Sequence, residues 1–251
     1  MIRNFSTNYK IVKNILNKGF YFETSFFAKP KDGSKGEDAF AYNKTMMCVA
    51  DGVGGWNHQG VDPSKYSNAL VNNYQKLYNK THLDKINDIA LFTKACSLSK
   101  TIIGSSTFCS CRLYGNTLHT LNLGDSGYAL IQNGKLTYKS KEQQHSFNFP
   151  YQVGTHGDNP LKAEKEEHRN IKENDMVILG TDGLWDNLYE TTLLDMILNG
   201  KSAKNIGDLC YKLSKKKLYL SPFCVNSNMR YLGGKPDDIT ILIGKIKYGL
   251  I

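Results

Sequence analysis

The chain has few arginines and no apolar run long enough to cross a membrane. Only four of its 32 basic residues are arginines, although the net charge is +9. Bidentate contacts to bases or phosphates favour arginine, and the lysines form no dense basic stripe. We therefore attribute the positive charge to solvated lysines and expect no nucleic-acid partner, leaving a basic RNA- or DNA-binding protein as a weaker hypothesis. No run of about 18 apolar residues exists, so we expect no membrane span.

Cysteine, histidine and glycine also lack the spacings of several common sites. The six cysteines form no C-x-x-C pair, and several fall on apolar faces, which indicates small core residues in a reducing compartment. The six histidines are scattered, with no convincing Ser-His-Asp order. No glycine-rich phosphate-binding loop is found between a strand and a helix. These absences argue against a zinc site, a serine hydrolase and a nucleotide-binding fold.

Residues 1–19 are predicted to be an N-terminal extension, and residues 20–251 a single domain without repeats or linkers. The extension is basic, lacks acidic residues and has apolar residues at helical spacing. This pattern is typical of an organellar transit segment, but an ordinary N-terminal helix or tail shows it too. The first interpretation predicts the mitochondrial matrix or another organelle, and the second the cytoplasm.

The rest of the chain alternates short strands with amphipathic helices. Strands are expected at 21–28, 39–42, 45–50, 106–114, 117–123, 128–132, 135–139, 176–180 and 239–243, and helices at 62–78, 84–99, 191–198 and 202–213. Asp62 and Pro63 are suited to the cap and first position of the first helix. Residues 140–169 are polar and irregular, which indicates a surface or lid region.

Three of the apolar strands carry a carboxylate at one end. Asp51 follows the strand at 46–50, Asp182 follows the strand at 176–180, and Asp237 precedes the strand at 239–243. A buried carboxylate is costly unless it is paired or bound to metal. Glycines beside these acids let main-chain carbonyls approach a ligand closely. We therefore predict that the three strand ends form one acidic cluster.

A predicted hairpin brings two further acids to this cluster. Its turn lies near Asn43, so its open ends meet, and Glu37 and Asp38 lie beside Asp51. An all-oxygen cluster of this kind suits Mg²⁺ or Mn²⁺. Two such cations sharing a carboxylate and a water generate hydroxide near neutral pH and clamp a phosphoryl oxygen. The chemistry that this predicts is phosphate-ester hydrolysis without a covalent enzyme intermediate.

Five motifs in order extend this prediction to a family. They are Glu37-Asp38-Ala39, Asp51-Gly52-Val53-Gly54-Gly55, Leu123-Gly124-Asp125-Ser126-Gly127, Thr181-Asp182-Gly183-Leu184-Trp185-Asp186 and Lys235-Pro236-Asp237-Asp238-Ile239-Thr240. The series resembles that of the type 2C, metal-dependent Ser/Thr protein phosphatases. Residues 54–56, 60–64, 142–145 and 221–223 are further similar to the small mitochondrial branch of that family.

The resemblance implies an α+β fold in which two antiparallel sheets pack face to face between helices, a four-layer αββα sandwich. It implies a monomeric protein phosphatase that hydrolyses phosphoserine and phosphothreonine in protein substrates, through a water that bridges two Mn²⁺ or Mg²⁺ ions. A pseudophosphatase that binds phosphorylated partners without turnover is the alternative. Degenerate members usually lose metal ligands, and retention of Asp51, Asp182 and Asp237 argues against that alternative.

The resemblance also assigns roles to the metal ligands. Asp51 would bridge both ions, Asp182 and Asp237 would complete the first ion's protein ligands, and the Gly52 carbonyl would bind the second. Glu37 matches a position that binds metal through water or orients a ligand.

Other motif positions have less direct roles in this resemblance. Asp38, the partner of Glu37 in the acidic pair, is grouped with the catalytic residues. Asp125 and Asp186 match positions of a weaker third ion.

Two positions depart from the family pattern. Many relatives have histidine where this chain has Val53, and an arginine that holds the substrate phosphate near the position of Gly33. Lys31 or Lys35 is a possible replacement for the arginine, as a point charge without bidentate geometry. The valine also occurs in the mitochondrial branch, so it is consistent with activity.

Overall fold

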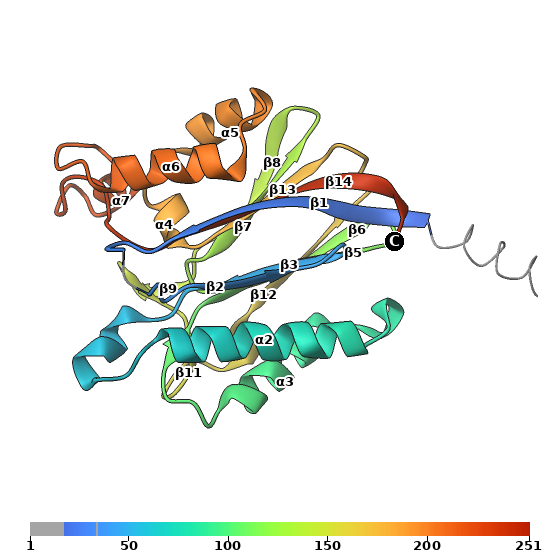
Figure 1. Ribbon diagram of the computed structural model, residues 1–251, viewed down its shortest axis with the longest axis horizontal. Coiled ribbons are helices and arrows are strands. Elements are labelled where there is room, and N and C mark those ends of the chain that lie inside the picture. Colours follow the sequence, from blue (N-terminus) through green and yellow to red (C-terminus); the bar gives the residue numbers. More distant parts are fainter. Residues whose placement is uncertain (1–17, 34) are drawn as a thin grey trace, which may run out of the picture.

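The computed structural model describes residues 18–33 and 35–251. Two antiparallel sheets of five strands pack face to face, and helices cover the outer side of each sheet (Figure 1). The predicted αββα arrangement is thereby confirmed. The transit-segment prediction falls on residues outside the described part of the chain.

The first sheet has the strand order β1-β14-β13-β7-β8. Its strands are β1 (Lys18–Lys29), β14 (Ile239–Leu250), β13 (Met176–Gly180), β7 (Gly127–Gln132) and β8 (Lys135–Lys139). The two longest strands, β1 and β14, pair over their full length, from Lys18 opposite Leu250 to Lys29 opposite Ile239. The two ends of the described chain therefore lie side by side.

The second sheet has the order β12-β6-β5-β3-β2. Its strands are β12 (Glu164–Arg169), β6 (Thr117–Leu123), β5 (Phe108–Tyr114), β3 (Met46–Ala50) and β2 (Ala39–Tyr42). The hairpin expected around Asn43 is present as β2 paired with β3. Asn43 Oδ1 accepts hydrogen bonds from the amides of Thr45 and Met46, which stabilise the turn.

The region 140–169, expected to be irregular, contains more pairing than the sequence suggested. The short strands β9 (Gln144–Ser146) and β10 (Phe149–Pro150) pair with each other, and β11 (Val153–Gly154) pairs with β4 (Ser105–Ser106). The region also contains the 3₁₀ turn η3 (Pro160–Lys162). Its last six residues form β12. Five of those six residues are exposed, which suits an edge strand that only one neighbour pairs with. Such a charged edge strand lacks the apolar alternation that predicts strands.

The strand β3 explains how the core is divided. All five of its residues are buried, and they alternate between two apolar clusters. Met47 and Val49 pack between the sheets, while Met46, Cys48 and Ala50 face the helices on the outer side. A strand covered on both faces reads as a continuous apolar run, as this one does.

Helices α2 (Ser64–Lys80) and α3 (Asp88–Ser99) cover the second sheet, and α4 (Asp182–Trp185), α5 (Glu190–Leu198), α6 (Ala203–Ser214) and α7 (Pro222–Asn226) lie on the side of the first sheet (Figure 1). The buried face of α2 includes Tyr66, Leu70, Tyr74 and Tyr78, as an amphipathic helix at this position requires. Two 3₁₀ turns, η1 (Gly54–Gln59) and η2 (Leu83–Lys85), precede α2 and α3.

The predicted start of α3 at residue 84 was wrong. The helix begins at Asp88, because Asn87 caps it by accepting a hydrogen bond from the Ala90 amide at 3.1 Å. Residues 83–85 form only the short turn η2.

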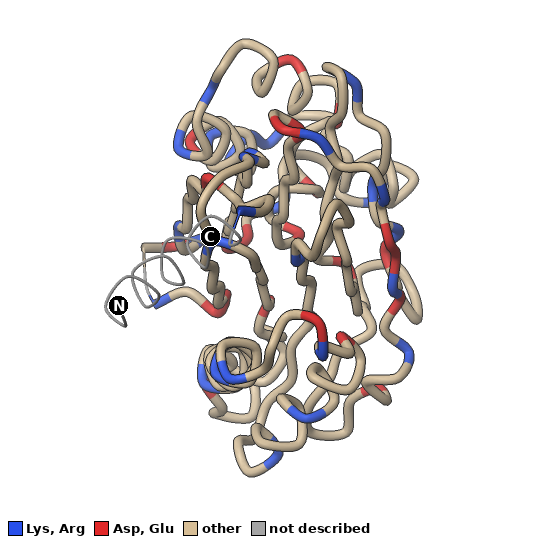
Figure 2. Tube along the Cα trace, turned by 90° about the vertical axis from the view of Figure 1, so that its right-hand side faces the viewer, with Lys and Arg blue, Asp and Glu red and all other residues tan. Residues whose placement is uncertain are grey.

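All six cysteines are buried thiols without disulfides. Within the described residues no helix is both long and apolar enough to span a bilayer. Lysine and arginine positions are spread over the trace and interleaved with acidic ones (Figure 2). Along the traced chain the charges thus form no single basic stripe.

Candidate active site

The predicted acidic cluster lies where both sheets end, at the start of α4. Asp51 follows β3 of the second sheet, Asp182 follows β13 of the first, and Asp125 lies in the turn from β6 to β7. One carboxylate oxygen from each of these three residues lies within 4.8 Å of the others. Asp237 and Glu37 line the same cavity of about 250 Å³, together with Gly52. The structure therefore brings the predicted strand ends together.

Two glycines permit the close approaches on which this arrangement depends. A Cβ atom on Gly52 would lie 2.6 Å from the Glu37 carbonyl oxygen, which accepts the Gly52 amide at 3.2 Å. A Cβ on Gly183 would collide with the carbonyl of Asp238. Only glycine fits at either position, so the β2–β3 hairpin closes and the start of β14 packs against Asp182.

Asp238 positions the loop that carries Glu37, a role that the sequence motifs did not reveal. Its two carboxylate oxygens accept hydrogen bonds from the backbone amides of Lys31 and Glu37, at 2.9 and 2.5 Å. The Glu37 carboxylate accepts hydrogen bonds from Lys31 Nζ at 3.0 Å and Asn57 Nδ2 at 2.5 Å. Asp238 is buried and faces this loop, whereas Asp237 faces the cavity.

Asp38 connects the two sheets. Its Oδ2 accepts a hydrogen bond from Thr181 Oγ1 at 2.8 Å, and the same hydroxyl oxygen accepts the Thr240 amide at 3.1 Å. Burial, followed by the charge of Asp238, raises the pKa of Asp38 well above the ordinary value. This hydrogen bond fixes the Asp38 side chain next to Asp182, on the side of the cluster away from the cavity.

The cluster carries more negative charge than its surroundings compensate. Burial, followed by the charge of Asp182, raises the pKa of Asp51, Asp125 and Asp237 above the ordinary value. Oδ1 of Asp38, Asp125 and Asp182 is each buried without a hydrogen-bond partner. A buried carboxylate oxygen without a partner costs folding free energy. Carboxylate oxygens are the ligands that hard divalent cations prefer, so a bound ion would remove this cost. The residues present therefore fit the implied metal ions.

Two lysines that line the cavity contribute positive charge. Lys31 Nζ lies 3.0 Å from Glu37 Oε2 and 3.6 Å from Asp237 Oδ1. Lys35, the other candidate for the missing arginine, instead pairs at the surface with Asp62 at 3.3 Å.

Lys235, to which the sequence motifs assigned no role, donates hydrogen bonds to Asp182 and Asp186. Asp186 is half-buried beside this lysine, and its pKa is raised by burial.

Val53 lines the cavity at the position where many relatives have histidine. Its amide donates to the Ser105 carbonyl at 3.0 Å, and the Ser105 hydroxyl accepts from Trp56 Nε1 at 2.6 Å. The apolar side chain therefore stands on a fixed backbone, and it has no proton to donate.

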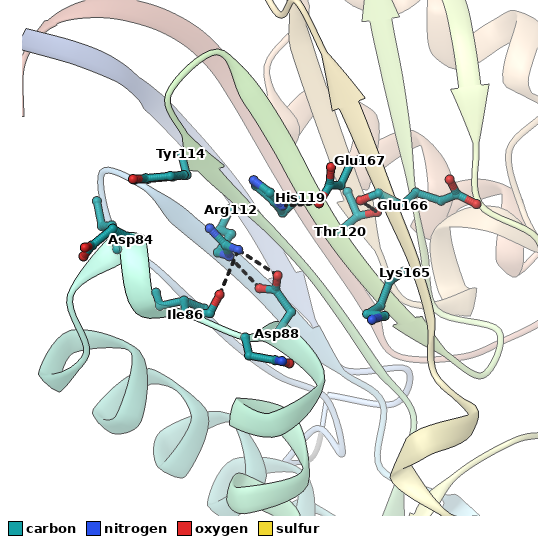
Figure 3. A pocket seen from close by; sticks show the side chains of 12 residues that line it. Asp84, Ile86, Asp88, Arg112, Tyr114, His119, Thr120, Lys165, Glu166 and Glu167 are labelled. Carbon is teal, nitrogen blue, oxygen red and sulfur yellow. Dashed lines mark hydrogen bonds and ion pairs between the residues drawn. The ribbon is translucent and has the colours of Figure 1, made fainter.

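A second cavity, of about 490 Å³, lies between the start of α3 and the outer face of β5, β6 and β12 (Figure 3). Its most buried charge, Arg112, is only 4% exposed and makes a bidentate pair with Asp88 at 2.6 and 2.8 Å. The pair neutralises itself, and within the described residues the carboxylates that line this cavity do not converge into a group that could hold a metal ion, as Asp51, Asp125 and Asp182 do. The acidic cavity is therefore the stronger candidate for catalysis.

Known proteins are similar to this chain over most of its length. The chain is 34% identical over 248 residues to the protein phosphatase PTC7 homologue fig of Drosophila mojavensis, covering 86% of this chain and 79% of that protein. It is 33% identical over 225 residues to the human protein phosphatase PTC7 homologue, covering 79% and 74%. No family model matches the chain.

Solved structures show the same fold. The photosystem II phosphatase PBCP superposes with a TM-score of 0.84 at 26% identity, covering 90% of this chain and 99% of that one. The catalytic domain of the serine/threonine phosphatase PstP, solved with two manganese ions, superposes with a TM-score of 0.65 at 15% identity, covering 90% and 99%.

The fold and the carboxylate-lined cavity are those of a metal-dependent phosphatase. The chain belongs to the type 2C protein phosphatases, with the PTC7 homologues among its relatives. Its enzymatic class is that of the protein serine/threonine phosphatases, as the ordered motifs predicted.

Proposed function

We propose that this enzyme hydrolyses phosphoserine and phosphothreonine in protein substrates with two divalent cations, Mn²⁺ or Mg²⁺, held by the acidic cluster. The observation that carries the proposal is the convergence of Asp51, Asp125 and Asp182, whose carboxylate oxygens lie within 4.8 Å of one another from three separate parts of the chain. PstP, with the same fold, binds two manganese ions.

The residues have distinct proposed roles. Asp51 directly follows β3, where both sheets end, and would bridge the two ions, while Asp182 and Asp237 would hold the first and the Gly52 carbonyl would hold the second. When bound, such cations supply a nucleophilic hydroxide near neutral pH and neutralise charge on the phosphoryl oxygens. Glu37 faces the cavity from the loop that Asp238 fixes.

Two further side chains support this arrangement. Asp38 orients the cluster from behind through its hydrogen bond with Thr181. Lys31 holds the substrate phosphate, because its ammonium lines the cavity while that of Lys35 pairs at the surface. The lysine acts as a point charge.

The test is hydrolysis of a phosphothreonine peptide by the full chain after treatment with EDTA. Activity is expected to vanish and to return with Mn²⁺ or Mg²⁺, because the ligands are all oxygens. Restoration by Zn²⁺ alone would contradict the metal assignment. A folded protein that binds Mn²⁺ without turnover would favour the pseudophosphatase alternative.

The proposal includes a location and an oligomeric state. We place the enzyme in the mitochondrial matrix or another organelle, on the basis of the acid-free residues 1–18 and of the motifs that resemble the mitochondrial branch of the family. Fusion of residues 1–19 to a fluorescent reporter tests this, and a diffuse cytosolic signal would count against import by this segment.

We also propose that the enzyme is a monomer, which light scattering of the purified chain tests directly.

A further inference from the structure

Lys235 places a positive charge inside the acidic cavity. Its ammonium donates hydrogen bonds to Asp182 Oδ2 and, at 2.8 Å, to Asp186 Oδ2, and it lies 3.4 Å from Asp237 Oδ2. An ammonium has three N–H donors, and here three carboxylates surround it. The side chain is only 12% exposed. Its contacts are therefore those of a bound cation.

The backbone of Lys235 is held in place as firmly as its ammonium. Asn187, which is fully buried, accepts a hydrogen bond from the Lys235 amide at 2.9 Å and donates one to its carbonyl at 2.9 Å. On the other side, the ammonium lies 5.2 Å from the centre of the Phe223 ring. The lysine is thus directed into the cluster by a fixed loop.

The hydrogen bonds divide the carboxylates of the cavity into two groups. Oδ1 of Asp125 and Oδ1 of Asp182 are buried and have no partner, so they remain available to metal. In contrast, Oδ2 of Asp182 and Oδ2 of Asp186 are already bound by the ammonium. Asp186 is also absent from the group formed by Asp51, Asp125 and Asp182. A divalent ion at Asp186 would therefore have to displace the lysine.

We propose that the ammonium of Lys235 is a tethered cation that takes the place of a third metal ion at Asp186. The inference rests on the proposed two-ion function and revises the weaker third ion that the family resemblance implies at Asp125 and Asp186. Because the charge is covalently attached, this part of the site stays neutralised at any metal concentration. The enzyme then holds two divalent ions where the free carboxylates would accept three.

The test is the number of Mn²⁺ ions bound by the metal-free full chain, measured by equilibrium dialysis and calorimetry. Two ions are expected for the wild type and for Lys235→Arg, which keeps the charge. Three are expected for Lys235→Met, and two again for the double variant Lys235→Met with Asp186→Asn. Lys204→Met, which breaks an exposed ion pair with Asp208, is the matched control and should bind two.

One additional ion in Lys235→Met, relative to a wild type that binds no more than two, supports the inference. An unchanged number, or a third ion in the wild type, overturns it. If Lys235→Met fails to fold, as circular dichroism would show, Lys235→Gln gives the same comparison with a neutral side chain. Failure of the proposed function is separate, because it appears as a wild type that binds no Mn²⁺.

Discussion

Thr181 and Asp38 join the two sheets directly behind the acidic cluster, through a hydrogen bond of 2.8 Å between Thr181 Oγ1 and Asp38 Oδ2. The Thr181 hydroxyl also accepts the Thr240 amide, so one side chain links the end of β13 to β14 and to the second sheet. The Thr181 hydroxyl thereby helps to fix how the two halves of the site face each other.

Thr181→Val should lower both stability and activity. Valine has the same shape but leaves the Thr240 amide and Asp38 Oδ2 without this buried partner, which costs about 1–3 kcal/mol. We expect a lower denaturation midpoint in urea and a higher Mn²⁺ concentration for half-maximal activity. Thr191→Val, at an exposed position of α5, is the control. Equal behaviour of the two variants would show that the Thr181 hydroxyl is unimportant.

Asp51→Asn and Asp237→Asn should each abolish hydrolysis while the protein stays folded. Each change removes a charge from a cavity proposed to bind two dications, and neutral amide oxygens bind such ions weakly. The measurement is the rate on a phosphothreonine peptide at saturating Mn²⁺, with circular dichroism as the check on folding. A near-wild-type rate for either variant would rule out its proposed ligand role.

Asp51→Asn should also stabilise the metal-free protein at neutral pH. Burial and the charge of Asp182 raise the pKa of Asp51, so the folded state binds a proton more tightly than the unfolded state. The free energy of unfolding in EDTA therefore falls as pH rises from the unfolded pKa of about 4 through the raised folded value. Asparagine carries no charge, so its melting temperature should be several degrees higher, at about 2–4 °C per kcal/mol.

The control for this stability comparison is Asp208→Asn, whose carboxylate is exposed on α6. It should leave the melting temperature in EDTA nearly unchanged. An Asp51→Asn protein that melts below the wild type in EDTA would contradict the electrostatic account of the cluster.

Lys31→Met should weaken binding of the phosphorylated substrate. The Lys31 ammonium lines the cavity, and loss of a charged hydrogen bond to phosphate costs about 1.5–3 kcal/mol, equivalent to a KM roughly 10- to 100-fold higher. Lys35→Met is the matched control, because that lysine pairs with Asp62 outside the cavity. Similar KM values for the two variants would remove Lys31 from the phosphate site.

Val53→His should change turnover little on phosphoserine and phosphothreonine peptides. The valine lines the same cavity as Asp51, on a backbone held by the Ser105 carbonyl, and it has no proton to donate, so we expect hydrolysis here not to depend on a side-chain acid at this position. General acid catalysis by a well-placed histidine is typically worth ~10²–10⁴-fold. A gain of that size, confined to phosphopeptides and absent with aryl phosphates, would show that this chain lacks a useful acid.

The sequence by itself determined most of the strands and the gathering of the carboxylates, and through the family resemblance it implied the two-sheet fold. Apolar runs that end in Asp51 and Asp182 or begin after Asp237 predict strands by local periodicity, and a hairpin around Asn43 places Glu37 and Asp38 beside Asp51. The ordered motifs then identified the family, which the relatives confirm. These are features encoded by residues close to one another in the chain.

Only the tertiary structure decided what surrounds those carboxylates. The strand β12 is charged and exposed, so its pairing with β6 leaves no periodic pattern in the sequence. The positions of Lys235 and Asp238 depend on hydrogen bonds to Asn187 and Glu37, which lie far away along the chain. Local sequence predicts which residues end a strand. The partners that compensate a buried charge are decided by the packing of distant segments against each other.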